Sequence, residues 1–277
     1  MSTSIPQHFI KQYESEVHEA YQRQGSKLRN TVRTKTNVTG STVQFPKVGK
    51  GVASKKTRHG TVPVMNVDHT FVTATLEDHY AGDWHDKLDE MKTNINERQV
   101  IANAGAMALG RKTDDIILEA ISAATLETAV GTTGMTVDKI EVSIAEMGER
   151  DVPVDHGEMY GLIGWREWTD LLGEERFSSA DYVPPSEMPY QGKGIWAKMY
   201  FGAMWMPHSV ILPDGSDITT NYLYHSSAVG HAIGHDVSAD ITWHGDRAAH
   251  FINHMMSQGA TLIDNNGVQK IKADRSP

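Results

Sequence analysis

Two strand-like stretches lie on either side of a long basic interval, and this arrangement constrains the fold more than any other feature of the sequence. Residues 31–39 and 41–46 alternate and are rich in Val and Thr, and residues 68–80 again have the period of a β-strand. The interval 47–63 between them contains three glycines and no acidic residue. Its cationic side chains are Lys47, Lys50, Lys55, Lys56 and Arg58. Because so long a loop is uncommon inside a compact domain, we predict an extended hairpin whose loop contacts another molecule, with disorder as the alternative.

The charge of the chain is divided unevenly between this first part and the rest. Residues 1–62 carry 11 Lys and Arg against 3 acidic residues, whereas residues 63–277 carry 15 against 32. The formal net charge of the whole chain is −9. A basic arm on an acidic body indicates contact with nucleic acid or with an oppositely charged surface of a neighbouring copy. A solvated arm without a partner is the alternative.

The first residues contain a candidate amphipathic helix. Apolar side chains recur every four residues between positions 6 and 24: Phe9, Tyr13, Val17 and Tyr21. Such a stripe needs an apolar surface to cover it, which either the same chain or a neighbour can supply.

The rest of the chain mixes helical and strand-like periodicity. The longest helix is expected over about residues 95–124, with a break near Gly110 because glycine weakens a helix interior. Shorter helices are predicted over 136–150 and 165–173, strands over 158–164 and 195–212, a connection over 177–194, and a C-terminal strand pair over 260–273 that turns at Asn-Asn-Gly. The fold class is therefore α+β.

Motifs that carry enzyme chemistry are absent from the sequence or incomplete. The GKG triplets at 49–51 and 192–194 do not extend into a phosphate-binding loop, no G-x-S-x-G motif occurs, and the chain has no cysteine. Two histidine pairs, His231 with His235 and His250 with His254, have the i, i+4 spacing of zinc ligands on a helix. In neither pair is the first histidine followed by the glutamate that a zinc hydrolase uses as base. We therefore predict no catalytic, cofactor-binding or metal-ligating residue and no cofactor.

The order of segments resembles a known family. YQRQGSKLRNTV (21–32) is followed by TVQFPKVGKG (42–51), DHTFVTATLEDHYAGDW (68–84), HDKLDEMKTNINERQVIANAGAMALGRKTDDIILEAI (85–121) and GATLIDNNGVQKIKA (259–273). In this order the chain looks like the major capsid protein of a tailed bacteriophage with the Hong Kong 97-type fold. The similarity extends over nearly the whole chain and depends on the combination of segments, since none of them is a catalytic signature.

The resemblance implies a division of the chain into the parts of that fold. Residues 1–30 would be the N-arm, and 31–80 the first strands and the extended E-loop hairpin, the latter at about 42–76. Residues 81–134 would form the peripheral domain with its long spine helix, 135–255 the axial domain, and 256–277 C-terminal strands that return to the peripheral domain. The E-loop cations Lys47, Lys50, Lys55, Lys56 and Arg58 would then contact neighbouring subunits.

The resemblance also implies function and partners. The chain would self-assemble through hexamers and pentamers into the icosahedral head shell of a tailed double-stranded DNA phage, act as no enzyme, and belong to the virion after assembly in the host cytoplasm. We expect a separate scaffolding protein, a portal, decoration proteins and weak non-specific contact with packaged DNA. No membrane contact is expected, because no apolar run approaches the length of a membrane span.

Two other functions stay open at the level of sequence. The same fold occurs in encapsulin-like nanocompartment shells that hold an enzyme cargo. A His/Asp metal-dependent enzyme is an alternative from a different class, because six histidines and three aspartates gather between 225 and 254: His225, His231, His235, His244, His250, His254, Asp236, Asp240 and Asp246.

Overall fold

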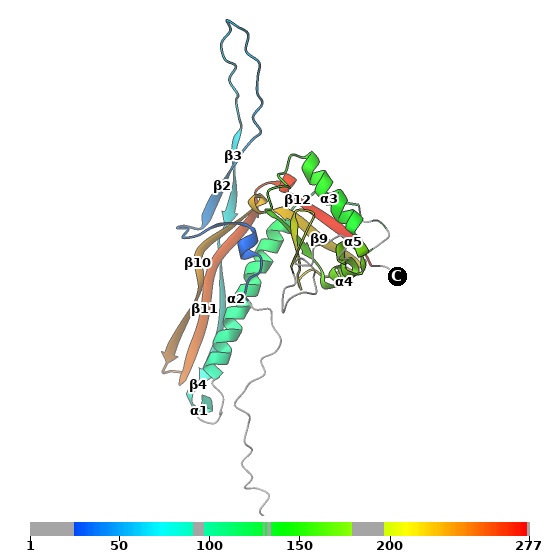
Figure 1. Cartoon of the computed structure of the whole chain (residues 1–277). Helices are drawn as coiled ribbons and strands as arrows, with labels where there is room; N and C mark the ends of the chain where they lie inside the picture. Colours follow the sequence, from blue (N-terminus) through cyan, green and yellow to red (C-terminus); the bar gives the residue numbers. More distant parts are fainter. Residues whose placement is uncertain (1–24, 91–96, 130, 132–133, 179–196, 276–277) are drawn as a thin grey trace, which may run out of the picture. The chain divides into compact units, whose positions relative to one another are not determined.

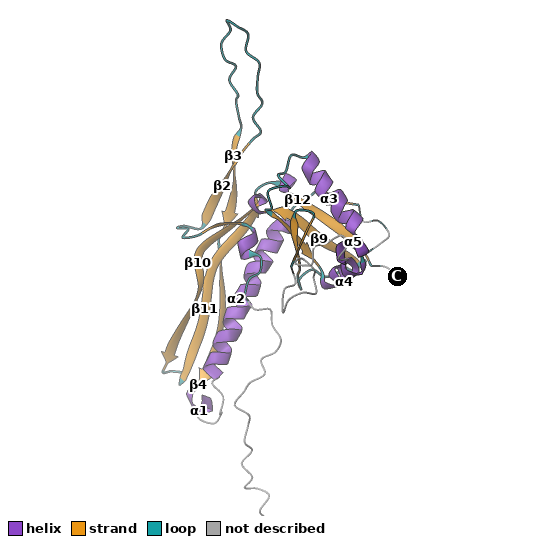
Figure 2. Cartoon of the chain, viewed as in Figure 1, coloured by secondary structure: helices purple, strands orange, loops and turns teal. Residues whose placement is uncertain are grey.

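The computed structural model describes residues 25–90, 97–129, 131, 134–178 and 197–275 (Figure 1). The amphipathic helix predicted over residues 6–24 lies outside the described residues, as does nearly all of the connection predicted over 177–194. Helices and strands both make up much of the described chain, which confirms the predicted α+β class (Figure 2).

The chain forms two compact units, and each unit is built from segments that are distant in sequence. Unit 1 comprises Met1–Ser26, Asp78–Lys112 and His235–Ser257. Unit 2 comprises Lys27–Glu77, Thr113–Gly234 and Gln258–Pro277. These units do not end where the domains predicted from the sequence end, so the peripheral and axial boundaries stay predictions.

A six-stranded sheet lies at the centre of unit 2. Its order is β5-β12-β9-β6-β8-β7. The strands are β5 (Glu127–Thr128), β6 (Met159–Ile163), β7 (Lys198–Tyr200), β8 (Ala203–Pro207), β9 (Ile218–His225) and β12 (Val268–Asp274). β9 pairs antiparallel with both β12 and β6, whereas β6 and β8 are parallel. The strands predicted over 158–164 and 195–212 are therefore confirmed, the second as the pair β7 and β8.

Two helices of unit 2 confirm the short helices predicted from periodicity. They are α3 (Val137–Glu149) and α4 (Trp165–Gly173), and α4 is followed by the short α5 (Glu175–Ser178). Thr136 caps α3, because its hydroxyl oxygen accepts the backbone N–H of Lys139 at 3.4 Å. The inward side chains of these helices share one buried cluster with the sheet, which includes Ile140, Ile144, Met147, Trp168, Phe177 and Trp205.

The long helix α2 (Glu97–Ser122) is continuous, so the break predicted near Gly110 is wrong. The two central glycines of α2 allow close packing rather than ending the helix. A Cβ at Gly105 would lie 2.4 Å from the ring of His254, and a Cβ at Gly110 would lie 2.8 Å from the backbone of Gly25. Within the described ranges, no helix is both long and apolar enough to cross a lipid bilayer.

A four-stranded sheet has the order β1-β10-β11-β4. Its strands are β1 (Arg33–Lys35), β10 (Val229–His244), β11 (Ala249–Leu262) and β4 (Glu77–Asp86), and the short helix α1 (Lys87–Glu90) follows β4. The strand predicted over 68–80 is in fact two strands. β3 (His69–Thr75) pairs with β2 (Thr42–Val48) in a separate two-stranded sheet, and β4 begins after Leu76 in this one.

The C-terminal strand pair predicted over 260–273 is wrong, because β11 and β12 belong to different sheets. A 3-10 turn at Asn265–Gly267 makes a corner between them. The Asp264 carboxylate accepts the N–H of Asn266 at 3.1 Å, and the N–H groups of Ile263 and Asp264 both donate to the carbonyl of Ala228. These bonds fix the end of β11 on the segment before β10, so that the chain cannot fold back on β11 as a hairpin.

Candidate assembly surface

The β2–β3 hairpin continues into a long loop without regular structure. The strands pair antiparallel from Thr42 opposite Thr75 to Val48 opposite His69. One further bond, from the N–H of Gly49 to the carbonyl of Asp68 at 2.8 Å, closes the ladder. Residues 50–67, which we call the hairpin loop, contain no strand or helix and continue beyond the ends of β2 and β3 (Figure 1).

Large apolar side chains of the hairpin loop are exposed to solvent. Val62 and Val64 are 73% and 89% exposed, and Val52 and Met65 are more than half exposed as well. Phe71 on β3 is also exposed. Apolar groups gathered on one exposed segment mark a surface that binds another molecule.

The other end of the hairpin is buried, and we call its inward residues Val43, Phe45 and Ala74 the hairpin root. They pack with Ala232 of β10 and with Ile263 in one hydrophobic cluster. The ring of Phe45 packs closely on Gly230, where an added Cβ would be 2.8 Å from the ring. The root therefore fixes the direction of a hairpin whose loop is uncovered.

The five predicted contact residues divide into two groups. Lys47 pairs with Asp264 at 2.9 Å, and Lys50 pairs with Asp151 and also donates to the carbonyl of Arg150 at 3.3 Å. Both therefore bind the same chain. The ammonium of Lys50 lowers the pKa of Asp151 through its hydrogen bond and its charge.

The second group is Lys55, Lys56 and Arg58, all in the hairpin loop. Their side chains are exposed, and none of them forms an ion pair with another residue that the structure describes. That these cations contact a neighbouring subunit stays a prediction.

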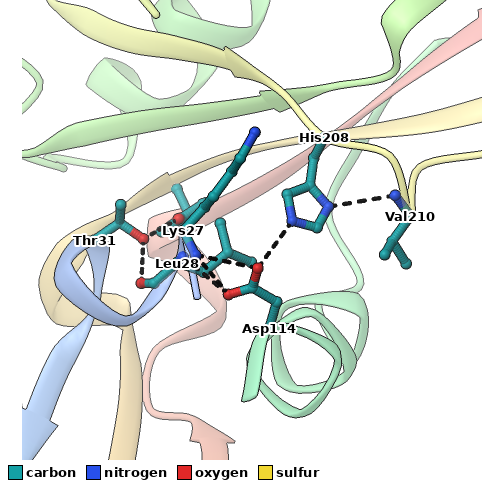
Figure 3. Close-up of polar contacts among 7 residues, drawn as sticks. Lys27, Leu28, Thr31, Asp114, His208 and Val210 are labelled. Carbon is teal, nitrogen blue, oxygen red and sulfur yellow. Dashed lines mark hydrogen bonds and ion pairs between the residues drawn. The ribbon is translucent and has the colours of Figure 1, made fainter. Parts of the chain in front are cut away.

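A buried polar cluster fixes the start of the described chain on α2 (Figure 3). The carboxylate of Asp114 accepts the backbone N–H of Lys27 at 3.0 Å and that of Leu28 at 3.1 Å. The same carboxylate lies 3.2 Å from Nε2 of His208, and both side chains are fully buried. Sequence analysis did not identify this cluster. Asp114 lies three residues before Ile117, and residues three apart share one face of a helix, so the spacing could have placed this carboxylate on the buried face.

A second bond set extends this anchor to Thr31. Its hydroxyl donates to the carbonyl of Leu28 at 2.8 Å and shares a 2.5 Å hydrogen bond with the Tyr224 hydroxyl (Figure 3 draws the bond to Leu28). Burial raises the pKa of Tyr224, so that its phenol stays protonated. Residues 27–31 are thereby held on α2 and β9.

The predicted histidine pairs lie on strands and not on a helix. His231 and His235 are on β10, and His250 and His254 are on β11. Residues four apart on a strand are separated by about 13 Å, which is too far for one zinc ion. In the part of the chain that the structure describes, no three His, Asp or Glu side chains are placed to hold a metal ion. His231 instead contacts Gln258 at 3.1 Å inside unit 2.

Comparison with known families gives a match over nearly the whole chain. A family described as "Phage capsid protein" matches residues 5–275. No curated protein matches the chain.

Solved phage structures share the fold at low sequence identity. The capsid structure of the cyanophage P-SCSP1u is 15% identical, with a TM-score of 0.74 over 100% of this chain and 96% of that chain. A structure from Mycobacterium phage Che8 is 16% identical, with a TM-score of 0.74 over 95% and 97% of the two chains. The capsid of Ralstonia phage GP4 is 11% identical, with a TM-score of 0.74 over 100% and 98%. This likeness is one of fold, and it confirms the predicted Hong Kong 97-type capsid fold.

Proposed function

The chain belongs to the phage capsid protein family, and we propose that its subunits hold one another through the hairpin loop. It is a major capsid protein, which self-assembles to form the phage head shell. One observation carries the proposal: the hairpin root is buried in its own subunit, whereas Val62 and Val64 of the loop are exposed. The loop cations Lys55, Lys56 and Arg58 form no ion pair with the described residues of that subunit.

Charge supports contact between copies. The loop carries Lys55, Lys56 and Arg58, and residues 63–277 have a large excess of acidic side chains. Each exposed ion pair contributes only about 0–1 kcal/mol, but a shell repeats the pair at every subunit. Salt screens such pairs, so assembly should weaken as ionic strength rises.

Apolar burial and symmetry support the same contact. Covering Val62, Val64 and Met65 on a neighbour removes apolar surface from water at about 25 cal/mol per Å². A loop that binds a different surface of the next copy makes a heterologous contact, and repeated contacts of this kind close into rings. Lys47 and Lys50, which pair within the chain, would hold the base of the loop in place during this contact.

The finer features of the assembly belong to the same proposal. The rings would be hexamers and pentamers of an icosahedral head in a tailed double-stranded DNA phage, assembled in the host cytoplasm. A separate scaffolding protein, a portal and decoration proteins would be the other partners, with weak non-specific contact to DNA. In this proposal the chain has no catalytic role.

Shortening the hairpin tests the proposal. We would replace residues 50–67 with Asn-Gly, which joins Gly49 to Asp68 by a two-residue turn and keeps the whole β2–β3 ladder. The variant and the wild type are compared under conditions in which the wild type forms closed particles, with a scaffolding protein if one is needed. Circular dichroism monitors folding, and electron microscopy with sedimentation velocity monitors assembly.

We expect a folded subunit that does not form closed particles. Normal particles from the shortened chain would contradict the proposal. A matched control keeps the loop and its charge but exchanges the cations, with Lys55→Arg, Lys56→Arg and Arg58→Lys, and it should assemble like the wild type.

A further inference from the structure

The turn between β7 and β8 in unit 2 carries a phenylalanine in a strained conformation. Tyr200 pairs with Ala203, which leaves a two-residue turn at Phe201 and Gly202. Both turn residues have a positive φ, +49° for Phe201 and +79° for Gly202. Asn-Gly is the favoured pair in such a turn, because a bulky side chain is strained at positive φ. Phe201 therefore weakens the turn that contains it.

Phe201 also belongs to an exposed apolar patch. It is 59% exposed, and Met199 and Met204, which pair across β7 and β8, are exposed as well. We call these three residues the turn patch. Neither the strain nor the exposed apolar surface stabilises an isolated subunit. Strained residues persist mostly where they contact another molecule, so the turn patch is a candidate contact.

A pocket of about 530 Å³ opens at the other end of β8. We call it the α4 pocket, because Trp165 at the start of α4 forms one wall. Ile211, Leu212 and Pro213, which follow β8, form the rest of its apolar wall, and Leu212 is 72% exposed. β8 has five residues and spans about 17 Å, so the turn patch and the α4 pocket of one subunit lie apart.

Two arginines also line the α4 pocket. The buried carboxylate of Glu167 holds Arg275 in place, because it accepts a hydrogen bond from Nε of Arg275 at 2.6 Å. The guanidinium of Arg166 forms no ion pair with any residue in the described ranges. A guanidinium binds the face of an aromatic ring and also pairs with carboxylates. The α4 pocket therefore favours an aromatic side chain with an acidic group beside it.

An acidic side chain accompanies the turn patch. The carbonyl of Val154 lies 3.1 Å from the position that a Cβ on Gly202 would occupy, so the turn packs against this residue. Asp155 follows Val154, and its exposed carboxylate lies 2.9 Å from Nδ1 of His156. The turn patch and Asp155 together supply the aromatic ring and the carboxylate that the α4 pocket favours.

We propose that Phe201 of one subunit inserts into the α4 pocket of the next copy in the shell. Assembly of the shell supplies that second copy. Pockets of about 300–1,000 Å³ bury drug-sized molecules, so the α4 pocket can hold an aromatic ring. The contact joins two different surfaces at opposite ends of β8, so it is heterologous and can repeat around a ring. It is separate from the contact proposed for residues 50–67, which take no part in it.

Phe201→Asn distinguishes a binding role from a structural one. Asparagine is favoured at positive φ, so the variant subunit should be at least as stable to chemical denaturation as the wild type. Under conditions in which the wild type forms closed particles, electron microscopy and sedimentation velocity should show at least 10-fold fewer particles. Val142→Asn, at an exposed position of α3 outside both surfaces, is the matched control and should assemble like the wild type.

Normal assembly of Phe201→Asn would overturn the proposal. Loss of stability together with loss of assembly would also contradict it, because Phe201 would then support its own subunit. A second variant changes the other surface. Leu212→Glu on the rim of the α4 pocket should fold normally and assemble as poorly as Phe201→Asn, and its normal assembly would equally overturn the proposal.

Cross-linking identifies the two surfaces directly, since the chain has no cysteine. Chains with Met199→Cys, which keep Phe201, are assembled with chains carrying Ser209→Cys in the α4 pocket. The control mixture replaces Ser209→Cys with Val142→Cys. A short bismaleimide should link the test pair at least 10-fold faster than the control pair on a denaturing gel. Equal rates would overturn the proposal, as would dimers that form equally fast from Met199→Cys chains alone, because the patch would then contact its own counterpart.

Discussion

At the scale of single residues, Asp114 shows how a buried charge can position a chain. Its carboxylate receives two backbone N–H groups and lies beside His208, without solvent exposure. A buried carboxylate is tolerated only when such donors replace its water, and removing one partner of a buried charged set costs about 3–5 kcal/mol. The free energy of unfolding of the subunit therefore depends on the contact between Asp114 and the backbone of Lys27 and Leu28.

We predict that Asp114→Asn lowers the free energy of unfolding by about 2–4 kcal/mol, because the amide offers one acceptor where the carboxylate offers two. The measurement is chemical denaturation of the unassembled subunit. Glu119→Gln, on an exposed position of the same helix, serves as the control and should change stability by less than about 0.5 kcal/mol. Equal stability of the two variants would show that the Asp114 cluster does not anchor the segment.

A second residue-scale prediction concerns His225 and pH. Burial lowers the pKa of His225 below its usual 6.5, although Glu158 raises it in part. The folded protein therefore keeps this histidine neutral while the unfolded chain takes up a proton. Its contribution to stability is present above pH 6.5 and is lost as the pH falls below 6.5 toward the folded pKa.

Denaturation measured between about pH 5 and 8, a range of about one and a half units on either side of the usual histidine pKa, tests this. His225→Gln should flatten the decline in unfolding free energy on the acidic side, whereas His59→Gln, in the exposed hairpin loop, should leave the decline unchanged. The idea fails if both variants retain the full decline.

Residue-scale inference from sequence was limited by distance along the chain. The basic composition of the interval 47–63 identified Lys47 and Lys50 as candidate contact residues. It could not identify their partners, Asp264 and Asp151, which lie more than 100 residues away in the sequence. The i, i+4 histidines suggested zinc only if the segment was helical, and strand geometry removes that possibility. Local patterns identify candidate side chains, and the sheet order decides which of them meet.

At the scale of elements, the helix α2 combines unfavourable glycines with an unbroken 26-residue length. Each glycine costs about 1 kcal/mol relative to alanine in a helix interior. Gly105 offsets that cost because it lets the helix approach the His254 ring more closely than any residue with a Cβ could.

We predict opposite effects for two glycine-to-alanine substitutions. Gly105→Ala should destabilise the subunit by about 1–3 kcal/mol, since its Cβ would overlap the His254 ring. Gly148→Ala in α3, where no atom lies within 4 Å of the added Cβ, should be neutral or stabilise by up to about 1 kcal/mol. Thermal denaturation compares the two directly. A stabilising Gly105→Ala would mean that this close approach does not exist in solution.

Helices and strands were predicted correctly where neighbouring residues determine them. The predictions were wrong where the structure depends on contacts with residues distant in sequence. The helices at 136–150 and 165–173 have their own apolar periodicity, and the first also has a side-chain cap at Thr136. The structure has both within about two residues. The strand at 68–80 reads as continuous, yet the chain changes sheets at Leu76. The Asn-Asn-Gly turn has the composition of a hairpin but forms a corner, because its neighbours bond to Ala228 and not to each other.

At the scale of the whole molecule, the chain combines an anchored body with a segment that its own described residues leave uncovered. The hairpin root is packed like a protein core, whereas Val64 near the end of the loop is 89% exposed. An apolar side chain that stays exposed to water does not stabilise a monomer. In a shell, a neighbouring subunit can cover the same side chains, and this stabilising contact repeats at every subunit around each ring.

The most direct test of this account is an electron cryo-microscopy reconstruction of the particles that the full-length chain forms. We predict closed shells in which residues 50–67 of each subunit contact an adjacent subunit, with Lys55, Lys56 and Arg58 near its acidic side chains. Shells in which this loop projects into solvent without touching a neighbour, or a 30.6 kDa chain that stays monomeric where capsid proteins assemble, would contradict it.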